Sequence, residues 1–349
     1  MRVLPGLGLL PKPEFELAVI TMSAQHSATV PQPPIRFDRS TGVLEGANAW
    51  ERLAALALSS GSKVASTFSH RGYNHCANLL RKALPERDIA IKLNPDATFA
   101  FPYGDGYWSK LLNRSFAYEN ELELLFQDSV GVDYTLLDCG ANYGYWSVLV
   151  SSAPYGSHKA IAIEPSSQNF AKLANNAKIN GNRFEAMNCA IGAMRGIARL
   201  SGTKHEAFSI AGDADDGGEV VSVVALDNLL EDGKISPDGK YLIKLDVEGV
   251  EIEAIKGGAR LLRGDSVLLC EEHGNDPNHT VSRYILDQTP LKLIVHDPRT
   301  NRLETVTELS ILDRIKVSSH VGYNVFGTAS AFWLDRISAR NANAARRMQ

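Results

Sequence analysis

The chain has 349 residues, with 36 Lys and Arg residues against 40 Asp and Glu residues, so its net charge is −4 at neutral pH. Hydrophobic residues make up 44% and charged residues 22%, which is typical of a globular protein with a substantial core. This balance gives no basic footprint for nucleic acid or an anionic membrane, and no apolar run is long enough to span a bilayer. The four cysteines lie far apart, as in a reducing compartment. We therefore expect a cytoplasmic protein without a nucleic-acid partner or a membrane span.

Prolines dominate the start of the chain, with six of the fifteen in the first 34 residues. Because proline opposes both helix and sheet, residues 1–42 are predicted to form a poorly ordered tail. Residues 43–115 are predicted to form an N-terminal helical and hairpin extension. Its expected elements are a helix over Ala47–Leu58 that ends at Gly61, a helix over about Tyr73–Leu84, and two short strands, Ile89–Leu93 and Thr98–Phe101.

After a short helix at Glu119–Phe126, strands alternate with helices from residue 134 onward. The expected strands are Tyr134–Asp138, Ala160–Glu164, Phe184–Ala190, Val220–Leu226, Leu242–Asp246, Val267–Glu271 and Leu291–Val295, and the expected helices are Tyr145–Ser151, Gln168–Asn180 and Val250–Leu262. Apolar strands joined by helices predict an open, doubly wound α/β domain with a mostly parallel sheet. Such sheets bind ligands at the carboxyl ends of their strands.

The sharpest motif is Asp138-Cys-Gly140-Ala-Asn-Tyr-Gly144, directly after the first of these strands. It lacks the G-K-[S/T] of a phosphate loop and the third glycine of a dinucleotide fingerprint, and the acid before the first glycine would repel a pyrophosphate. Glu164 ends the next strand, where a carboxylate can accept both hydroxyls of a ribose. These features together indicate S-adenosylmethionine, with its ribose on Glu164 and its amino-acid portion over the glycine turn. The alternative is a structural turn with an acid nearby by chance.

At four segments the sequence resembles the FkbM family of S-adenosylmethionine-dependent methyltransferases. They are LLDCGANYGYWS (Leu136–Ser147), IEP (Ile163–Pro165), ALDNLL (Ala225–Leu230) and IKLDVEGVEIEAIKGG (Ile243–Gly258). The resemblance implies a Rossmann-like class I methyltransferase fold, a mostly parallel sheet of seven strands with one antiparallel strand. It also implies methylation, usually at oxygen, of sugars and other secondary metabolites. We assign residues 116–335 to this domain and residues 336–349 to a C-terminal tail.

Candidate cofactor-binding residues follow the first, second, third and later strands. Asn142 is expected either to bind the amino-acid end of the cofactor or to stabilise the turn through its side chain, and Asn188 is placed near the adenine by its position alone. The cofactor-binding set is Asp138, Gly140, Ala141, Asn142, Gly144, Glu164, Asn188 and Asp246.

Three residues are candidates for catalysis. Asp246 follows a central strand and is expected to hold the acceptor hydroxyl or take its proton, or else to cap the next helix. Glu248 is either a second such carboxylate or a brace for the loop. His273 follows the next strand and is a candidate general base, or a loop histidine bonded to a carboxylate. No spacing requires a metal, and none is assigned.

The leading hypothesis is a methyltransferase that transfers a methyl group to a hydroxyl of a carbohydrate or related metabolite. The expected partners are S-adenosylmethionine, a small-molecule or glycan acceptor and, as an open alternative, further copies of the chain. The aromatic stretch Phe99–Trp108 is either a wall for the acceptor or ordinary core. Two alternative functions remain at this stage, a catalytically silent cofactor-binding module and a nicotinamide-dependent oxidoreductase.

Overall fold

The computed structural model describes residues 32–201, 209–210, 218–316 and 322–347, and the elements below all lie within the unit Pro33–Gln349. Its large sheet consists of β5 (Thr135–Cys139), β6 (Lys159–Ile163), β7 (Glu185–Met187), β12 (Tyr241–Leu245), β13 (Ser266–Glu272), β14 (Lys292–Asp297), β15 (Arg302–Thr305) and β16 (Tyr323–Thr328). Its strand order is β15-β14-β16-β13-β12-β5-β6-β7.

The five strands from β13 to β7 are parallel neighbours, whereas β16 runs antiparallel to both β13 and β14. The predicted doubly wound, mostly parallel sheet is therefore confirmed. It has one strand more than the seven expected, because β15 pairs antiparallel with β14 and extends the edge.

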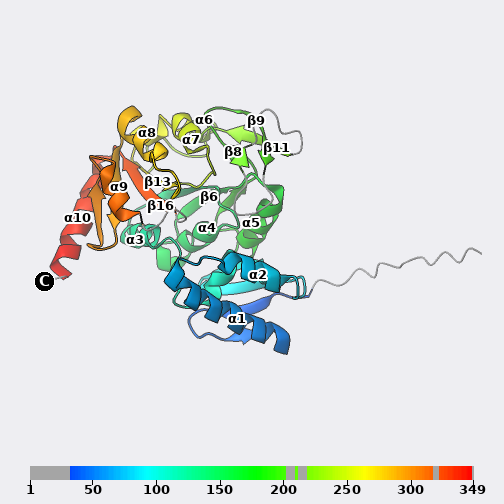
Figure 1. The fold of residues 1–349 in the computed structure, drawn as a ribbon. Coiled ribbons are helices and arrows are strands. Elements are labelled where there is room, and N and C mark those ends of the chain that lie inside the picture. Colours follow the sequence, from blue (N-terminus) through cyan, green and yellow to red (C-terminus); the bar gives the residue numbers. More distant parts are fainter. Residues whose placement is uncertain (1–31, 202–208, 211–217, 317–321, 348–349) are drawn as a thin grey trace, which may run out of the picture. The chain divides into compact units, whose positions relative to one another are not determined.

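Helices cover both faces of this sheet (Figure 1). Successive residues of a strand point to opposite faces, so Leu136 packs with one layer of helices and Leu137 with the other. One layer contains α3 (Asn120–Asp128), α4 (Tyr145–Val150), α5 (Ser167–Ile179) and α10 (Ala331–Arg347). The other layer contains α6 (Leu226–Glu231), α7 (Glu251–Gly257), α8 (Thr280–Gln288) and α9 (Ser310–Ile315). Two short 3-10 helices are η3 (Ala153–Tyr155) and η4 (Leu261–Arg263).

A small second sheet contains β8 (Ala190–Ile191), β9 (Gly196–Ser201), β10 (Ser209–Ile210) and β11 (Glu219–Val224), in the order β10-β9-β11-β8. Two predictions are corrected here. The expected strand Phe184–Ala190 is divided, since β7 ends at Met187 and Ala190 pairs in the small sheet, and the expected strand Val220–Leu226 also belongs to that sheet. An apolar run indicates a strand, but it does not say which sheet the strand joins.

The N-terminal extension contains β1 (Ile35–Asp38), β2 (Leu44–Glu45), α1 (Ala49–Ala65), η1 (Ser66–Phe68), α2 (Tyr73–Arg81), β3 (Asp88–Asn94), β4 (Ala97–Pro102) and η2 (Trp108–Leu112). The four strands form a sheet in the order β2-β1-β3-β4. The two helices and the hairpin are therefore confirmed. Their buried residues belong to the same hydrophobic cluster as α4 and α5, and the division into extension and domain stays a prediction.

Three boundaries differ from those predicted. Helix α1 does not stop at Gly61 but continues to Ala65, and Gly61 lies against the ring of Tyr73. Strand β1 lies inside the range predicted as an N-terminal tail, because it pairs with β3, while residues 1–31 of that tail lie outside the described residues. The predicted C-terminal tail over residues 336–349 contains most of α10, which is held by the buried Trp333 and Ile337.

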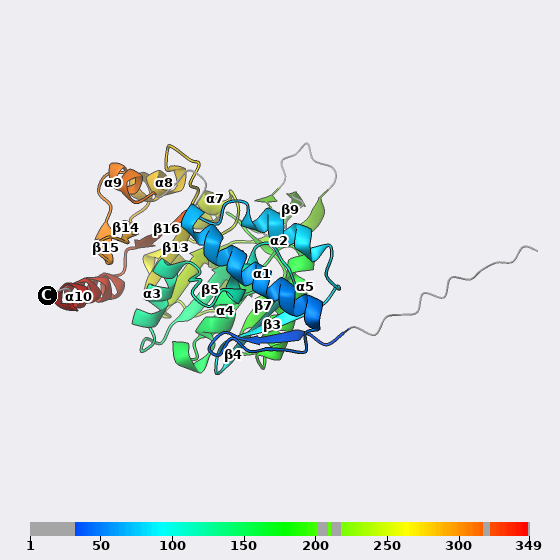
Figure 2. The same ribbon diagram turned by 60° about the horizontal axis from the view of Figure 1, so that its bottom comes forward.

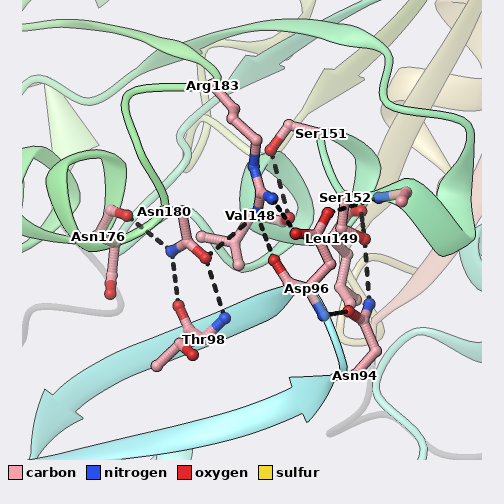
Figure 3. A network of polar contacts seen from close by, with 11 residues as sticks. Asn94, Asp96, Thr98, Val148, Leu149, Ser151, Ser152, Asn176, Asn180 and Arg183 are labelled. Atoms are coloured by element: carbon pink, nitrogen blue, oxygen red, sulfur yellow. Dashed lines mark hydrogen bonds and ion pairs between the residues drawn. The ribbon is translucent and has the colours of Figure 1, made fainter.

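Asparagine side chains from helices pair with the exposed edges of two sheets. Asn176 lies on α5, and Asn180 follows the last residue of this helix, one turn later. Asn176 accepts from the backbone N–H of Ala100 in β4 at 2.8 Å and donates to its carbonyl at 2.9 Å. Asn180 forms the same pair of hydrogen bonds with Thr98 of β4, at 3.0 and 2.7 Å (Figure 3). Asn341 of α10 forms the same pair of hydrogen bonds with Leu303 of β15. It accepts from the backbone N–H at 2.9 Å and donates to the carbonyl at 2.8 Å. Four residues of a helix advance about 6 Å along its axis, and two residues of a strand advance about 6.6 Å. Side chains one helical turn apart can therefore reach alternate residues of the same strand. The amides therefore satisfy edges that would otherwise be unpaired.

The hairpin of the extension has further ties to the large domain (Figure 3). Asp96, in the β3–β4 turn, forms an ion pair with Arg183 at 2.6 Å and accepts from the backbone N–H of Ala153 at 2.8 Å. Asn94 donates to the hydroxyl of Ser152 at 3.0 Å. These contacts hold β4 against α4 and α5.

We expect Asn176→Ala to lower the free energy of unfolding by about 2–3 kcal/mol, because it leaves a buried N–H and a buried carbonyl of Ala100 without their partners. Urea denaturation measures this change. Asn175→Ala, an exposed neighbour on the same helix, is the matched control and should change stability by less than about 0.5 kcal/mol. Equal effects of the two substitutions would contradict the pairing.

Candidate functional site

A cavity of about 840 Å³, including its open mouth, lies at the carboxyl ends of β5, β6 and β12. Strand β5 has β6 on one side and β12 on the other, which makes this edge the topological switch point where doubly wound sheets bind ligands. Seven of the predicted site residues line the cavity, namely Asp138, Gly140, Ala141, Asn142, Glu164, Asp246 and Glu248. Gly144, Asn188 and His273 are not in its lining.

The two glycines of the first-strand loop are required by neighbouring protein atoms. Gly140 has a φ of +77°, and a Cβ on it would lie 1.7 Å from the carbonyl oxygen of Asp246. Gly144 has a φ of +84°, and a Cβ there would lie 2.5 Å from a methyl group of Leu173. Gly140 therefore lets the loops after β5 and β12 meet at the cavity, while Gly144 permits close packing behind it.

Glu164 is buried and holds the loop after β5. Its Oε2 accepts from the backbone N–H of Asn142 at 2.8 Å, and its Oε1 accepts from the backbone N–H of Ser166 at 3.0 Å and from the Asn169 amide at 3.3 Å. A carboxylate offers about four acceptor positions, so these donors leave room for a hydroxyl from a ligand. Burial raises the pKa of Glu164 to about 7.

Asn142 links the first-strand loop to the N-terminal extension. Its backbone is left-handed, with a φ of +51°. Its Oδ1 accepts from the indole N–H of Trp108 at 3.0 Å and from the backbone N–H of Tyr143 at 2.8 Å. The Asn142 side chain is therefore held by its own loop and by Trp108 of the extension.

The side chain of Lys244 is buried among carboxylates in the wall of the cavity. Its Nζ lies 2.9 Å from Oδ2 of Asp246 and 3.9 Å from Oε1 of Glu119. In the sheet, Lys244 of β12 stands opposite Asp138 of β5. Burial lowers the pKa of Lys244, but the carboxylates of Asp246, Glu119 and Asp138 outweigh this effect and hold its pKa well above the ordinary value. Lys244 is therefore the compensating charge of the site.

Four carboxyl groups around this lysine have raised pKa values. Burial raises the pKa of Glu119 and of Glu248 to about 7, against the attraction of Lys244. Burial together with the charges of Asp246 and Glu119 raises the pKa of Glu271 to about 9. Burial also raises the pKa of Asp138, whose Oδ2 accepts from the Ser147 hydroxyl at 2.7 Å. The site thus contains several groups that can exchange protons near neutral pH.

The loop after β12 presents Glu248 to the cavity and is braced by Glu251. Glu248 has a left-handed backbone, with a φ of +52°, and Gly249 follows with a φ of +96°. The buried carboxylate of Glu251 accepts from the backbone N–H of Gly249 at 3.0 and 3.1 Å. The bracing role that was considered for Glu248 therefore belongs to Glu251 in the structure.

Two other predicted residues, Asn188 and His273, are near the cavity in sequence but are not part of its lining. Asn188 donates to the carbonyls of Glu164 and Pro165 at 2.9 and 3.0 Å, so it supports the loop after β6. Its neighbours Cys189, Ala190 and Ile191 line the cavity instead. His273 is half-buried and lies close enough to Glu248 for its charge to lower the pKa of that carboxyl.

Aromatic side chains form one side of the cavity. They are Tyr107, Trp108, Tyr118, Tyr145 and Trp146. The rings of Trp108 and Tyr145 stack with centroids 5.6 Å apart, and the indole N–H of Trp146 donates to Glu119 at 2.5 Å. Tyr107 and Trp108 come from the N-terminal extension, which therefore completes the site.

The sequence reasoning missed Lys244 and Glu119. A signal for Lys244 was present, because it is a lysine inside the apolar strand YLIKL. Glu119 had no such signal, since acids at the ends of elements are common. Among the described residues, no group of three or more His, Cys, Asp and Glu side chains is arranged to hold a metal ion.

Residues 138–288 match the family model described as the methyltransferase FkbM domain. This segment of the chain belongs to the FkbM methyltransferases. The predicted resemblance to this family is therefore confirmed over these residues. No curated protein matches the chain, and no helix in the described part is both long and apolar enough to cross a membrane.

The solved structures that are similar to the chain include three methyltransferases. The FkbM methyltransferase from Methylobacillus flagellatus KT is 17% identical over 56% of this chain and 43% of its own, less than half of its length, with a TM-score of 0.35. The precorrin-6y C5,15-methyltransferase from Geobacter metallireducens GS-15 is 13% identical, over 62% and 92% of the two chains, with a TM-score of 0.33. The SAM-dependent O-methyltransferase from Thermotoga maritima is 13% identical, over 72% and 80%, with a TM-score of 0.32.

We expect Lys244→Met to lower the free energy of unfolding by about 3–5 kcal/mol at pH 8, because it leaves buried carboxylates without their cation. The loss should be smaller at pH 6, because Glu119 and Glu248, whose pKa values are about 7, are then mostly protonated and need no cation. Chemical denaturation at the two pH values tests this. The control is Lys172→Met, which removes a partly exposed pair with Asp88 and should cost less than about 1 kcal/mol. Equal losses for the two variants at pH 8 would contradict the compensating role.

Proposed function

We propose that the cavity binds S-adenosylmethionine and that the protein methylates a hydroxyl oxygen of a small molecule or glycan. The observation that supports the cofactor best is Glu164, a buried carboxylate with an acceptor position left, beside a glycine turn at the switch point of the sheet. A carboxylate there suits a ribose hydroxyl. The carboxylates of Asp138 and Asp246 suit a ligand with positive charge.

The predicted cofactor residues divide in this proposal into those that contact the ligand and those that shape the cavity. Glu164 binds the ribose, and Asn142, held by Trp108, contacts the amino-acid end. Ala190 and Ile191 provide an apolar surface for the adenine. Gly140, Gly144 and Asn188 act indirectly, since they set the loops that form the cavity.

When bound, S-adenosylmethionine supplies an electrophilic methyl group on a sulfonium. The acceptor oxygen forms a bond to this carbon as the bond from carbon to sulfur breaks, and the hydroxyl proton leaves to a base. Asp246, whose Oδ2 is engaged by Lys244, orients the acceptor hydroxyl. Glu248 takes the proton, because a base with a pKa of about 7 is matched to neutral pH. His273 acts on Glu248 through its charge.

The acceptor side of the cavity is aromatic. Tyr107, Trp108 and Tyr118 line the cavity together with the carboxylates, and aromatic rings pack well on the C–H surfaces of sugar rings. This wall supports the choice of a carbohydrate or related metabolite as acceptor. Mass spectrometry of glycans and metabolites incubated with the protein and labelled methyl donor identifies it by the gain of one labelled methyl group in place of hydrogen.

We expect Glu164→Gln to weaken the binding of S-adenosylmethionine about 10- to 100-fold, because an amide cannot accept from all the donors that the carboxylate accepts. Calorimetry with S-adenosylmethionine and S-adenosylhomocysteine measures this, and Glu185→Gln, an exposed glutamate on β7, should bind like the parent protein. Failure of the parent protein to bind either ligand would refute the cofactor. Binding of NAD instead would favour an oxidoreductase.

We expect kcat/KM for the acceptor, at saturating methyl donor, to rise with pH through about 7, because Glu248 accepts a proton only when it is ionised. Glu248→Gln should remove this rise and lower the rate about 10²- to 10⁴-fold, with methyl-donor binding retained. Initial rates over pH 5.5–9 test both points. An unchanged pH profile in Glu248→Gln would mean that another group accepts the proton. Asp246→Asn would then be measured in the same way.

A further inference from the structure

Exposed apolar side chains gather on the helices of the N-terminal extension. Of the eleven large hydrophobic residues described as exposed, six lie in the 34 residues from Ala49 to Lys82. They are Trp50, Leu53, Leu56, Val64, Phe68 and Leu79. Exposed apolar residues are ordinary when scattered, but a contiguous group of them marks an interaction surface.

Four of these side chains form a stripe along α1. At 100° per residue, Trp50, Leu53, Leu56 and Val64 fall within about 120° around the helix. The opposite side of α1 is buried through Ala54 and Leu58 in the core. Helix α1 thus has an apolar side in the core and a second apolar side toward solvent, and Figure 2 shows the helix at the front of the view.

Basic side chains surround this stripe. The same 34 residues contain Arg52, Lys63, Arg71, Arg81 and Lys82, all of them exposed. The one acidic residue of this 34-residue segment, Glu51, is buried in an ion pair with Arg87. Arg52 and Lys63 adjoin the stripe on its Leu56 side by the same helical geometry. The net charge of −4 is a sum over the whole chain, so it does not reveal this local cationic surface.

We infer that α1 and α2 form a docking surface for an anionic lipid bilayer. Tryptophan, phenylalanine and leucine on one helix face, flanked by lysine and arginine, match a helix that lies in the interface of a membrane. The apolar stripe enters the acyl boundary, and the basic residues contact the anionic headgroups. A bilayer also accepts a convex helix face without a matching groove.

The charge of the surface argues against a second copy of the chain as occupant. A two-fold interface places the same patch on both partners, so the five basic residues of one copy would face those of the other. Nucleic acid is a poor candidate for a different reason. Its phosphates would contact the basic residues, but the apolar stripe would stay exposed to water. An anionic lipid surface satisfies both the charge and the apolar area.

Vesicle sedimentation with the full chain tests the inference. Vesicles of phosphatidylcholine with about one third phosphatidylglycerol should bind at least about tenfold more tightly than phosphatidylcholine alone, and less tightly as salt rises. Leu56→Ser with Phe68→Ser, and separately Arg52→Glu with Lys63→Glu, should each reduce binding about tenfold or more. Ile197→Ser and Lys292→Glu, exposed residues elsewhere, are the matched controls and should leave it unchanged.

Trp50 provides a readout specific to this surface, because the other three tryptophans, Trp108, Trp146 and Trp333, are buried. Brominated lipids should quench part of the fluorescence of the parent protein, and Trp50→Phe should abolish that quenching. Equal binding to both kinds of vesicle, or binding unaffected by the Leu56 and Phe68 substitutions, would overturn the inference. So would a concentration-dependent dimer in sedimentation velocity that Leu56→Ser dissociates, in a protein that does not bind vesicles.

Discussion

The ammonium group of Lys244 lies in a strand that is otherwise apolar, and it is surrounded by the carboxylates of Asp138, Asp246 and Glu119. A buried charge is tolerated only when partners of opposite charge lie in good geometry. Here that geometry depends on the register of the sheet, since Lys244 stands opposite Asp138 on the neighbouring strand. The same register brings the carbonyl of Asp246 against Gly140 and so brings two loops together at the cavity. Charge compensation and cavity shape therefore depend on one pairing of β5 with β12.

The N-terminal extension is tied to this site by polar contacts and by a shared core. Asn176 and Asn180 hold β4 against α5, and β4 leads to η2, where Trp108 bonds Asn142 in the first-strand loop. A displacement of the hairpin would therefore move the aromatic side of the cavity and the Asn142 side chain together. The outer side of the same extension is cationic and apolar. One short segment thus faces both the cavity and the surrounding solution.

Much of the fold was predictable because its signals are local. The strands β5, β6, β12 and β13 are apolar runs of ordinary length, and each is bounded by polar or turn residues. The small sheet was not predictable, since β11 has the same composition as a core strand and its partner β8 has two residues. The long α10 was also missed, because its anchors are few and its contacts to β15 are made by an asparagine amide. Pairing across distant parts of the chain leaves no periodic pattern.

By itself, the sequence determined the family, the strand-loop motif, and most of the carboxylates that reach the cavity, since each depends on residues close together in the chain. The tertiary structure decided which polar groups are buried together. Lys244, Glu119 and Glu271 come from three separate elements, and their pKa values depend on distances that no local pattern contains. It also decided that Glu251 braces the loop while Glu248 faces the cavity, and that Tyr107 and Trp108 belong to the site. Burial and electrostatic coupling arise only when distant segments pack, and for that reason the composition of the site follows from the fold.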